Sequence, residues 1–221
     1  MARDMYGTMS GPSAWMMTRT WDVPHVTLLA AMWTVMMVGM MLPSVAPLLL
    51  IYASILRQSP EGPRAALHVY PMAAGYLVVW IGFSLLATAA QRALGDTVLT
   101  PMMTVRSSAV ATALLAVAAV YQLTPIKETC LDSCRSPVSF IMRHMRLDAA
   151  GAFLMGLQHG VYCLGCCWAL MLLLFAGGIM NLWTIGALMV VVLIEKLEPF
   201  GLQTRKFNAL ALGAAALWIL L

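Results

Sequence analysis

Residues 149–176 read AAGAFLMGLQHGVYCLGCCWALMLLLFA and contain no charged side chain. An apolar run of about 20 residues is long enough to cross a bilayer as an α-helix, so this stretch predicts a membrane span. The whole chain has the same character, with 62% hydrophobic and 10% charged residues and a mean hydropathy of +0.85. This composition predicts an all-α polytopic transmembrane helix bundle and gives no indication of a water-soluble domain.

Apolar runs of similar length recur along the chain and predict about six spans. They lie near residues 26–55, 70–90, 107–123, 149–176, 178–194 and 207–221. The break between the fourth and fifth runs rests on the weak helix formers Gly177, Gly178 and Asn181, so a count of five also fits. Residues 124–148 form a connection between the third and fourth spans.

A methionine-containing tail, residues 1–25, precedes the first span. Beyond Met1, it contains Met5, Met9, Met16 and Met17. Thioethers are soft ligands suited to Cu(I), although an ordinary tail has the same appearance. No cleavable signal is apparent, because the first long apolar run begins after Val26 and contains Pro43 and Pro47 rather than a small-residue cleavage site.

The basic residues of the short loops predict the orientation of the bundle. The loops after the first, third and fifth spans hold nine: Arg57, Arg64, Lys127, Arg135, Arg143, Arg146, Lys196, Arg205 and Lys206. The tail and the loop after the second span hold four: Arg3, Arg19, Arg92 and Arg106. We therefore expect a bacterial inner-membrane protein with its N-terminus outside and residues 124–148 in the cytoplasm. The net charge of +4 then needs no nucleic-acid partner.

A ladder of soft ligands runs along the expected span at residues 149–176. Met155, His159, Cys163, Cys167 and Met171 follow one another at steps of four, with Cys166 beside them. Each step of four turns a helix position by only about 40°, so these side chains stay near one face. Thiolates and thioethers select Cu(I), and imidazole suits zinc and copper. We expect a metal site, with Cu(I) first and zinc as an alternative; the competing interpretation is ordinary packing of buried Cys and Met.

The first span carries a second concentration of sulfur. Met36, Met37, Met40 and Met41 lie on one half of this helix, together with Met32. Packing is the favoured interpretation, but the row can also guide copper if it faces the thiols. Gly156 and Gly160 would let a neighbouring helix approach the ladder closely. We take the first span as the hypothetical neighbour.

Cys130 and Cys134 form a Cys-x3-Cys in the connection 124–148, which places the two thiols one helical turn apart. With Lys127 and Arg135 nearby, these thiols are favoured as thiolates and predict a metal relay at the cytoplasmic face. The alternative is a surface turn with two idle thiols.

Several of these blocks resemble the bacterial predicted metal-binding integral membrane proteins, a domain of unknown function. The resemblance covers most of the chain and is carried by three blocks: MMVGMMLP at 36–43, YQLTP at 121–125 followed by Lys127, Cys130, Cys134, Arg135 and Pro137, and GVYCLGCCW at 160–168. Gly178, Met180, Asn181, Glu195 and Lys196 also follow the family pattern. The resemblance implies metal binding in a membrane and leaves the metal open.

Glu195 and Lys196 close the fifth expected span. We expect a helix end at the lipid headgroups, with the Lys196 side chain reaching toward water. In the alternative, Glu195 turns inward as a partner for a proton or cation, and Asn181 hydrogen-bonds across helices.

Two functions from other classes compete with metal handling. Cys163 and Cys166 form a Cys-x-x-Cys that a membrane thiol-disulfide oxidoreductase would couple to Cys130 and Cys134. The objection is that a low-pKa thiol of that type usually lies at a helix N-terminus, whereas Cys163 is expected deep in a span. The other alternative is a structural or assembly subunit of a larger membrane complex. Binding of a soft metal, first of all Cu(I), for transport, handling or delivery to a partner remains the favoured interpretation, with a copper chaperone or a larger membrane complex as the expected partner. Catalysis is the less favoured expectation, because the sequence contains no phosphate-binding glycine loop, paired carboxylates or catalytic triad.

Overall fold

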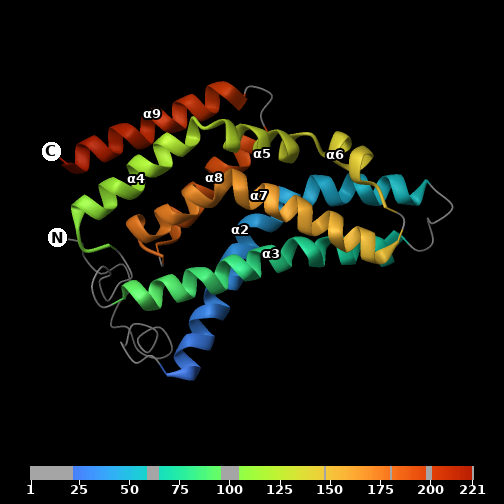
Figure 1. The fold of residues 1–221 in the computed structure, drawn as a ribbon, viewed down its shortest axis with the longest axis horizontal. Helices are drawn as coiled ribbons and strands as arrows, with labels where there is room; N and C mark the ends of the chain where they lie inside the picture. Colours follow the sequence, from blue (N-terminus) through green and yellow to red (C-terminus); the bar gives the residue numbers. More distant parts are fainter. Residues whose placement is uncertain are drawn as a thin grey trace.

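The computed structural model describes residues 22–58, 65–95, 105–146, 148–179, 181–197 and 201–220. The tail methionines Met5, Met9, Met16 and Met17 lie outside the described residues. The helices are α2 (Val23–Arg57), α3 (Ala65–Leu94), α4 (Ser108–Gln122), α5 (Pro125–Arg135), α6 (Pro137–His144), α7 (Ala149–Gly177), α8 (Leu182–Leu197) and α9 (Gly201–Leu220) (Figure 1). The described part of the chain is therefore all-α, as the composition predicts.

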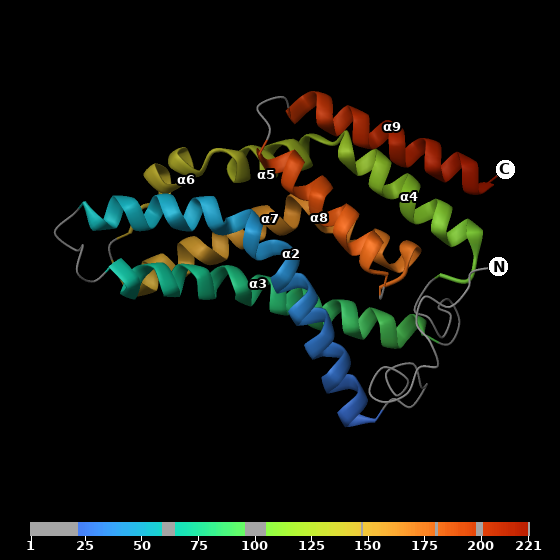
Figure 2. The ribbon, with the colours of Figure 1, turned by 180° about the vertical axis from the view of Figure 1, so that it is seen from behind.

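Helix α7 lies at the centre of the bundle. It begins at the N-cap Asp148, whose carboxylate accepts a hydrogen bond from the Gly151 amide at 2.9 Å. It ends where Gly178 adopts a positive φ of 91°, a conformation that costs glycine little. Figure 1 and Figure 2 show α7 running alongside α3.

Small residues bring α7 and α3 into backbone contact. A Cβ added at Gly156 would overlap the carbonyl group of Met72, and one added at Gly75 would overlap the carbonyl of Phe153. The close neighbour at the glycine row is therefore α3, and the hypothesis that it is the first span is wrong. The reason is steric, since only helices whose own facing positions are small can approach this closely.

Helix α2 changes direction midway, as Figure 2 shows, and contains Pro43 and Pro47. Proline lacks the amide hydrogen that would continue the helical ladder, which explains the bend. Before the bend, Trp33 connects α2 to two other helices: its Nε1 donates to Gln91 Oε1 at 2.8 Å, and its ring lies 5.3 Å from that of Phe175.

Among the residues that the structure describes, three helices are long and apolar enough to cross a membrane: α2, α3 from Leu67, and α7. Helices α4 and α5 meet at a bend of 66° and make a fourth candidate if they form one broken span. The prediction of six spans is not confirmed, because α8 and α9 are not among the helices that are long and apolar enough to cross a membrane. An α-helix of 16 residues, such as α8, is about 24 Å long and falls short of a hydrocarbon core of about 30 Å.

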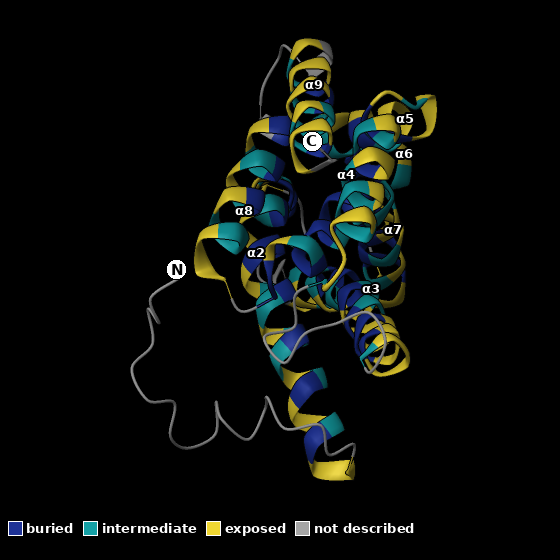
Figure 3. Ribbon diagram, turned by 90° about the vertical axis from the view of Figure 1, so that its left-hand side faces the viewer, coloured by how far each residue is buried: buried dark blue, intermediate teal, exposed yellow. Residues whose placement is uncertain are grey.

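Residues 124–148 differ from the expected connection because they contain α5 and α6. Thr124 caps α5 by accepting a hydrogen bond from the Lys127 amide at 3.3 Å. The thiol of Cys130 lies so close to Gly165 that a Cβ there would meet it at 2.7 Å. The segment thus folds onto α7, and Figure 3 shows both exposed and buried residues along its helices.

Candidate metal centre

Three thiols of α7 lie in the core of the bundle. Cys163, Cys166 and Cys167 are each at most 1% exposed. The thiols of Cys166 and Cys167 donate to the carbonyl oxygen of Cys163 at 3.0 and 2.9 Å, as cysteines three and four positions along a helix can. All five cysteines of the chain are free thiols. The three cysteines of α7 therefore place reduced thiols close together in the buried core.

Cys134 joins this cluster from α5. Its thiol lies near the side chains of Cys163 and Cys166, whereas Cys130 lies one turn away against Gly165. The sequence predicts a separate relay at a membrane face, but the structure places Cys134 beside the α7 thiols. We define the thiol cluster as Cys134, Cys163, Cys166 and Cys167.

His159 lies one helical turn before Cys163 and is 2% exposed. Its ring stands edge-on to Phe140 at 5.0 Å and near Tyr76 at 5.9 Å. Within the described residues, its Nδ1 has no hydrogen-bond partner. A buried polar atom is normally satisfied, so this nitrogen is free to take a ligand beside the thiol cluster.

Polar groups of α8 and α3 contact the sulfur of Cys163. Lys196 Nζ of α8 donates to its sulfur at 2.9 Å, and the Tyr76 hydroxyl of α3 lies 3.1 Å from the same sulfur. Lys196 also donates to Ser44 Oγ of α2 at 3.0 Å. The expectation that Lys196 reaches toward headgroups is wrong, because its ammonium is held inside the bundle by these two acceptors.

Glu195 also points inward. Its carboxylate accepts from Lys127 Nζ at 2.6 Å and from Asn208 Nδ2 at 2.6 Å. Its carbonyl accepts from Arg135 Nε at 2.6 Å. The predicted headgroup position is therefore wrong. Glu195 turns inward, as the alternative expects, and the cation that it pairs with is the Lys127 ammonium. Lys127 and Arg135 bind this residue, which links α5 to α8.

The side chain of Asn181 hydrogen-bonds to both neighbouring helices, because its Nδ2 donates to the carbonyl oxygen of Gly177 at the end of α7 at 3.4 Å. Its Oδ1 accepts from the amides of Trp183 at 3.0 Å and Thr184 at 3.4 Å, which caps the start of α8. This is the local use that asparagine makes of its side chain at a helix N-terminus.

The predicted methionine ligands of α2 and α7 lie in the core of the bundle. Met37, Met40, Met41, Met155 and Met171 are at most 3% exposed, and Met36 packs against the same core. The carbonyl oxygen of Met41 accepts from the Tyr76 hydroxyl at 3.2 Å, and that hydroxyl contacts Cys163. Tyr76 thus joins the methionine-bearing half of α2 to the thiol cluster.

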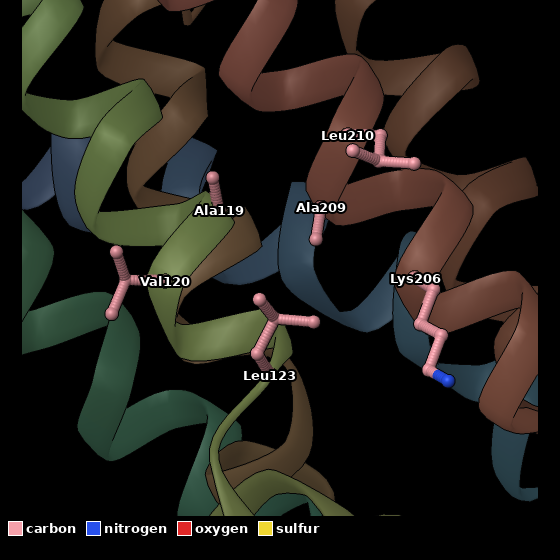
Figure 4. A pocket seen from close by; sticks show the side chains of 6 residues that line it. All are labelled: Ala119, Val120, Leu123, Lys206, Ala209 and Leu210. Atoms are coloured by element: carbon pink, nitrogen blue, oxygen red, sulfur yellow. The ribbon is translucent and has the colours of Figure 1, made fainter.

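An open groove of about 380 Å³ lies between α4 and α9 (Figure 4). Its lining residues are Ala119, Val120, Leu123, Lys206, Ala209 and Leu210. None of these side chains is a soft donor, so the groove is not a metal site.

No three His, Cys, Asp or Glu side chains of the described residues are arranged to hold a metal ion. Thiolates are soft ligands that bind Cu(I) and zinc, and structural zinc usually takes four protein ligands.

A family model described as PpoB2, copper chaperone, matches residues 30–219. The match includes every cysteine of the chain, His159 and the buried pair Glu195 and Lys196. No curated protein and no solved structure matches the chain.

Proposed function

Because this chain belongs to the PpoB2 copper chaperone family, we propose that it binds one Cu(I) ion at the thiol cluster within a membrane and delivers it to a partner protein. The observation that carries the proposal is the convergence of four buried or half-buried thiols from α5 and α7. The family match gives no support to the oxidoreductase or structural-subunit alternatives.

Cys163 and Cys167 are the proposed primary ligands. Both are almost completely buried in α7, and two thiolates satisfy a low-coordinate Cu(I) ion. Cys166 and the unpartnered nitrogen of His159 lie beside them as additional donors. Copper is the cargo of the protein in this proposal, and zinc is a weaker competitor.

Cys134 is the proposed exchange ligand. It stands on α5, the short helix that covers the α7 thiols, and its side chain reaches Cys163. A thiolate that replaces one primary ligand at a time can pass Cu(I) toward an acceptor without releasing a free ion. Cys130, one turn earlier on α5, is the proposed next position along this route.

The methionines of α2 are the proposed uptake path. Met36, Met37, Met40 and Met41 are thioethers near the bend of the helix, and Tyr76 joins this region to Cys163. Thioethers bind Cu(I) more weakly than thiolates, so an ion would move from the methionines toward the cluster. Met155 and Met171 flank the cluster along α7.

The proposed location is a bacterial inner membrane, which the chain crosses several times with its N-terminus outside. Three long apolar helices support membrane insertion, as do exposed apolar side chains such as Leu50 at 70% and Trp218 at 82%. Four of the nine basic residues that favour this orientation, Lys127, Arg135, Lys196 and Arg205, are used in contacts inside the bundle. A reporter active only outside the membrane, fused to the N-terminus, tests the orientation directly.

Copper loading of the detergent-purified chain tests the function. Wild type, Cys163→Ser with Cys167→Ser, and Met72→Leu as a control that removes a buried sulfur of α3 are loaded anaerobically with Cu(I) and analysed for metal. We expect about one ion in wild type and in the control, and a loss of most of it in the double variant while the bundle remains folded. Absence of Cu(I) from wild type, or full retention by the double variant, refutes the proposed site.

A further inference from the structure

Lys196 is a buried cation that forms no ion pair with a carboxylate of the described residues. Its side chain is 7% exposed, and its ammonium donates to Ser44 Oγ and Cys163 Sγ. The two ion pairs of the described residues are Lys127–Glu195 and Arg205–Glu128. The adjacent Glu195 is therefore already committed to Lys127.

A buried ammonium requires a nearby negative charge, because removing it from water is costly. Ser44 stays neutral. Cys163 is the acceptor that can supply the charge, since its sulfur becomes a thiolate when it binds a metal. The buried position of Lys196 is thus explained by the negative charge of the metal site rather than by the stability of a helix end.

We infer that Lys196 is a specificity-determining residue that matches the thiol cluster to a monovalent ion. Cu⁺ held by two thiolates carries a total charge of −1, and the ammonium of Lys196 brings the buried site to zero. Zn²⁺ held by the same two thiolates is neutral by itself, so Lys196 would leave one positive charge uncompensated. This inference rests on the proposed function and identifies Lys196 as the residue that selects the metal ion carried by the protein.

Zinc could restore neutrality only by recruiting a third thiolate. The described residues do not hold three such ligands in a metal-binding arrangement, so recruitment requires a rearrangement of Cys134 or Cys166. Cu(I) needs no such change because two thiolates suffice. The charge balance and the number of thiolates required therefore both favour Cu(I) over Zn(II).

Competition binding with two neutral variants tests the inference. Lys196→Met removes the charge at similar length, and Lys196→Gln also keeps a group that can donate to Ser44 and Cys163. We measure Cu(I) and Zn(II) dissociation constants against chelators for both variants and wild type. The matched control is Lys206→Met, because Lys206 lies at the groove between α4 and α9 rather than at the thiols.

We expect the preference for Cu(I) over Zn(II) to fall by roughly tenfold or more in either neutral variant, as expected for a lost buried charge partner. The Lys206→Met control should keep the wild-type preference. An unchanged preference in a folded neutral variant overturns the inference while the proposed function stands. Failure of wild type to bind Cu(I) refutes the proposed function itself.

A second measurement uses only the wild-type chain and is independent of how the variants fold. X-ray absorption spectroscopy at the copper and zinc edges counts the sulfur ligands in Cu(I)-loaded and Zn(II)-loaded protein. We expect two sulfur ligands for Cu(I) and three for Zn(II). A Zn(II) ion with only two sulfur ligands overturns the charge-matching inference.

Discussion

The ammonium of Lys127 on α5 lies 2.6 Å from the carboxylate of Glu195 on α8, and the two side chains are 1% and 2% exposed. This pair fixes α5 across the bundle, and α5 carries Cys134 to the thiols of α7. The residue after Glu195 is Lys196, which contacts Cys163. One turn of α8 therefore both secures the helix that covers the cluster and supplies the cation beside it.

Breaking this pair is expected to destabilise the protein strongly. Lys127→Met leaves the Glu195 carboxylate buried without its cation, which costs about 3–5 kcal/mol in comparable sites. The measurement is thermal unfolding of the detergent-purified protein. The double variant Lys127→Met with Glu195→Gln should recover much of the loss, because no uncompensated charge remains. Equal destabilisation of the single and double variants would show that the charge is not the cause.

Replacing Gly156 is expected to separate α3 from α7. A Cβ at Gly156 meets the backbone of Met72, which cannot move aside as a flexible side chain can. We expect Gly156→Ala to cost at least about 1–3 kcal/mol in unfolding experiments, the usual range for overpacking.

Gly213→Ala is the matched control for this glycine. Gly213 also lies inside a helix, α9, but a Cβ there has no atom within 4 Å. Alanine is the better helix former by about 1 kcal/mol, so the control should be unchanged or slightly more stable. Similar losses at both positions would contradict a close approach specific to α3 and α7.

Cys134→Ser is expected to slow copper transfer more than it weakens binding. Cys163 and Cys167 remain as primary ligands, so the loaded protein should still hold about one Cu(I). Transfer to a chelator, followed by absorbance in a stopped-flow instrument, should become several-fold slower. Unchanged transfer with unchanged binding would remove Cys134 from the proposed route.

Met40→Leu with Met41→Leu is expected to reduce copper uptake only when copper is scarce. Leucine preserves most of the buried volume and removes the sulfur, so the bundle should fold. Metal content at saturating Cu(I) should match wild type, while loading at limiting Cu(I) should be slower. Met72→Leu, which changes a buried methionine of α3 instead, is the control. Equal effects at both sites would assign these methionines to packing.

The all-α class and the thiol ladder follow from local sequence. Hydropathy over about 20 residues predicts an apolar helix, and steps of four place His159, Cys163 and Cys167 near one face whatever surrounds them. The helix at Ala149–Gly177 agrees closely with the predicted run at 149–176. Soft donors on that face indicated copper, and the family match supports a copper-related function.

The tertiary structure alone established which groups meet. Tyr76 contacts Cys163 across 87 positions of sequence, and Ser44 contacts Lys196 across 152. Helical periodicity specifies which residues share a face but contains no information about the helix opposite, which depends on small-residue approach and buried charge pairing. For that reason the neighbour of the glycine row is α3 rather than α2, Cys134 lies beside the α7 thiols, and Glu195 and Lys196 lie inside the bundle rather than at the membrane surface.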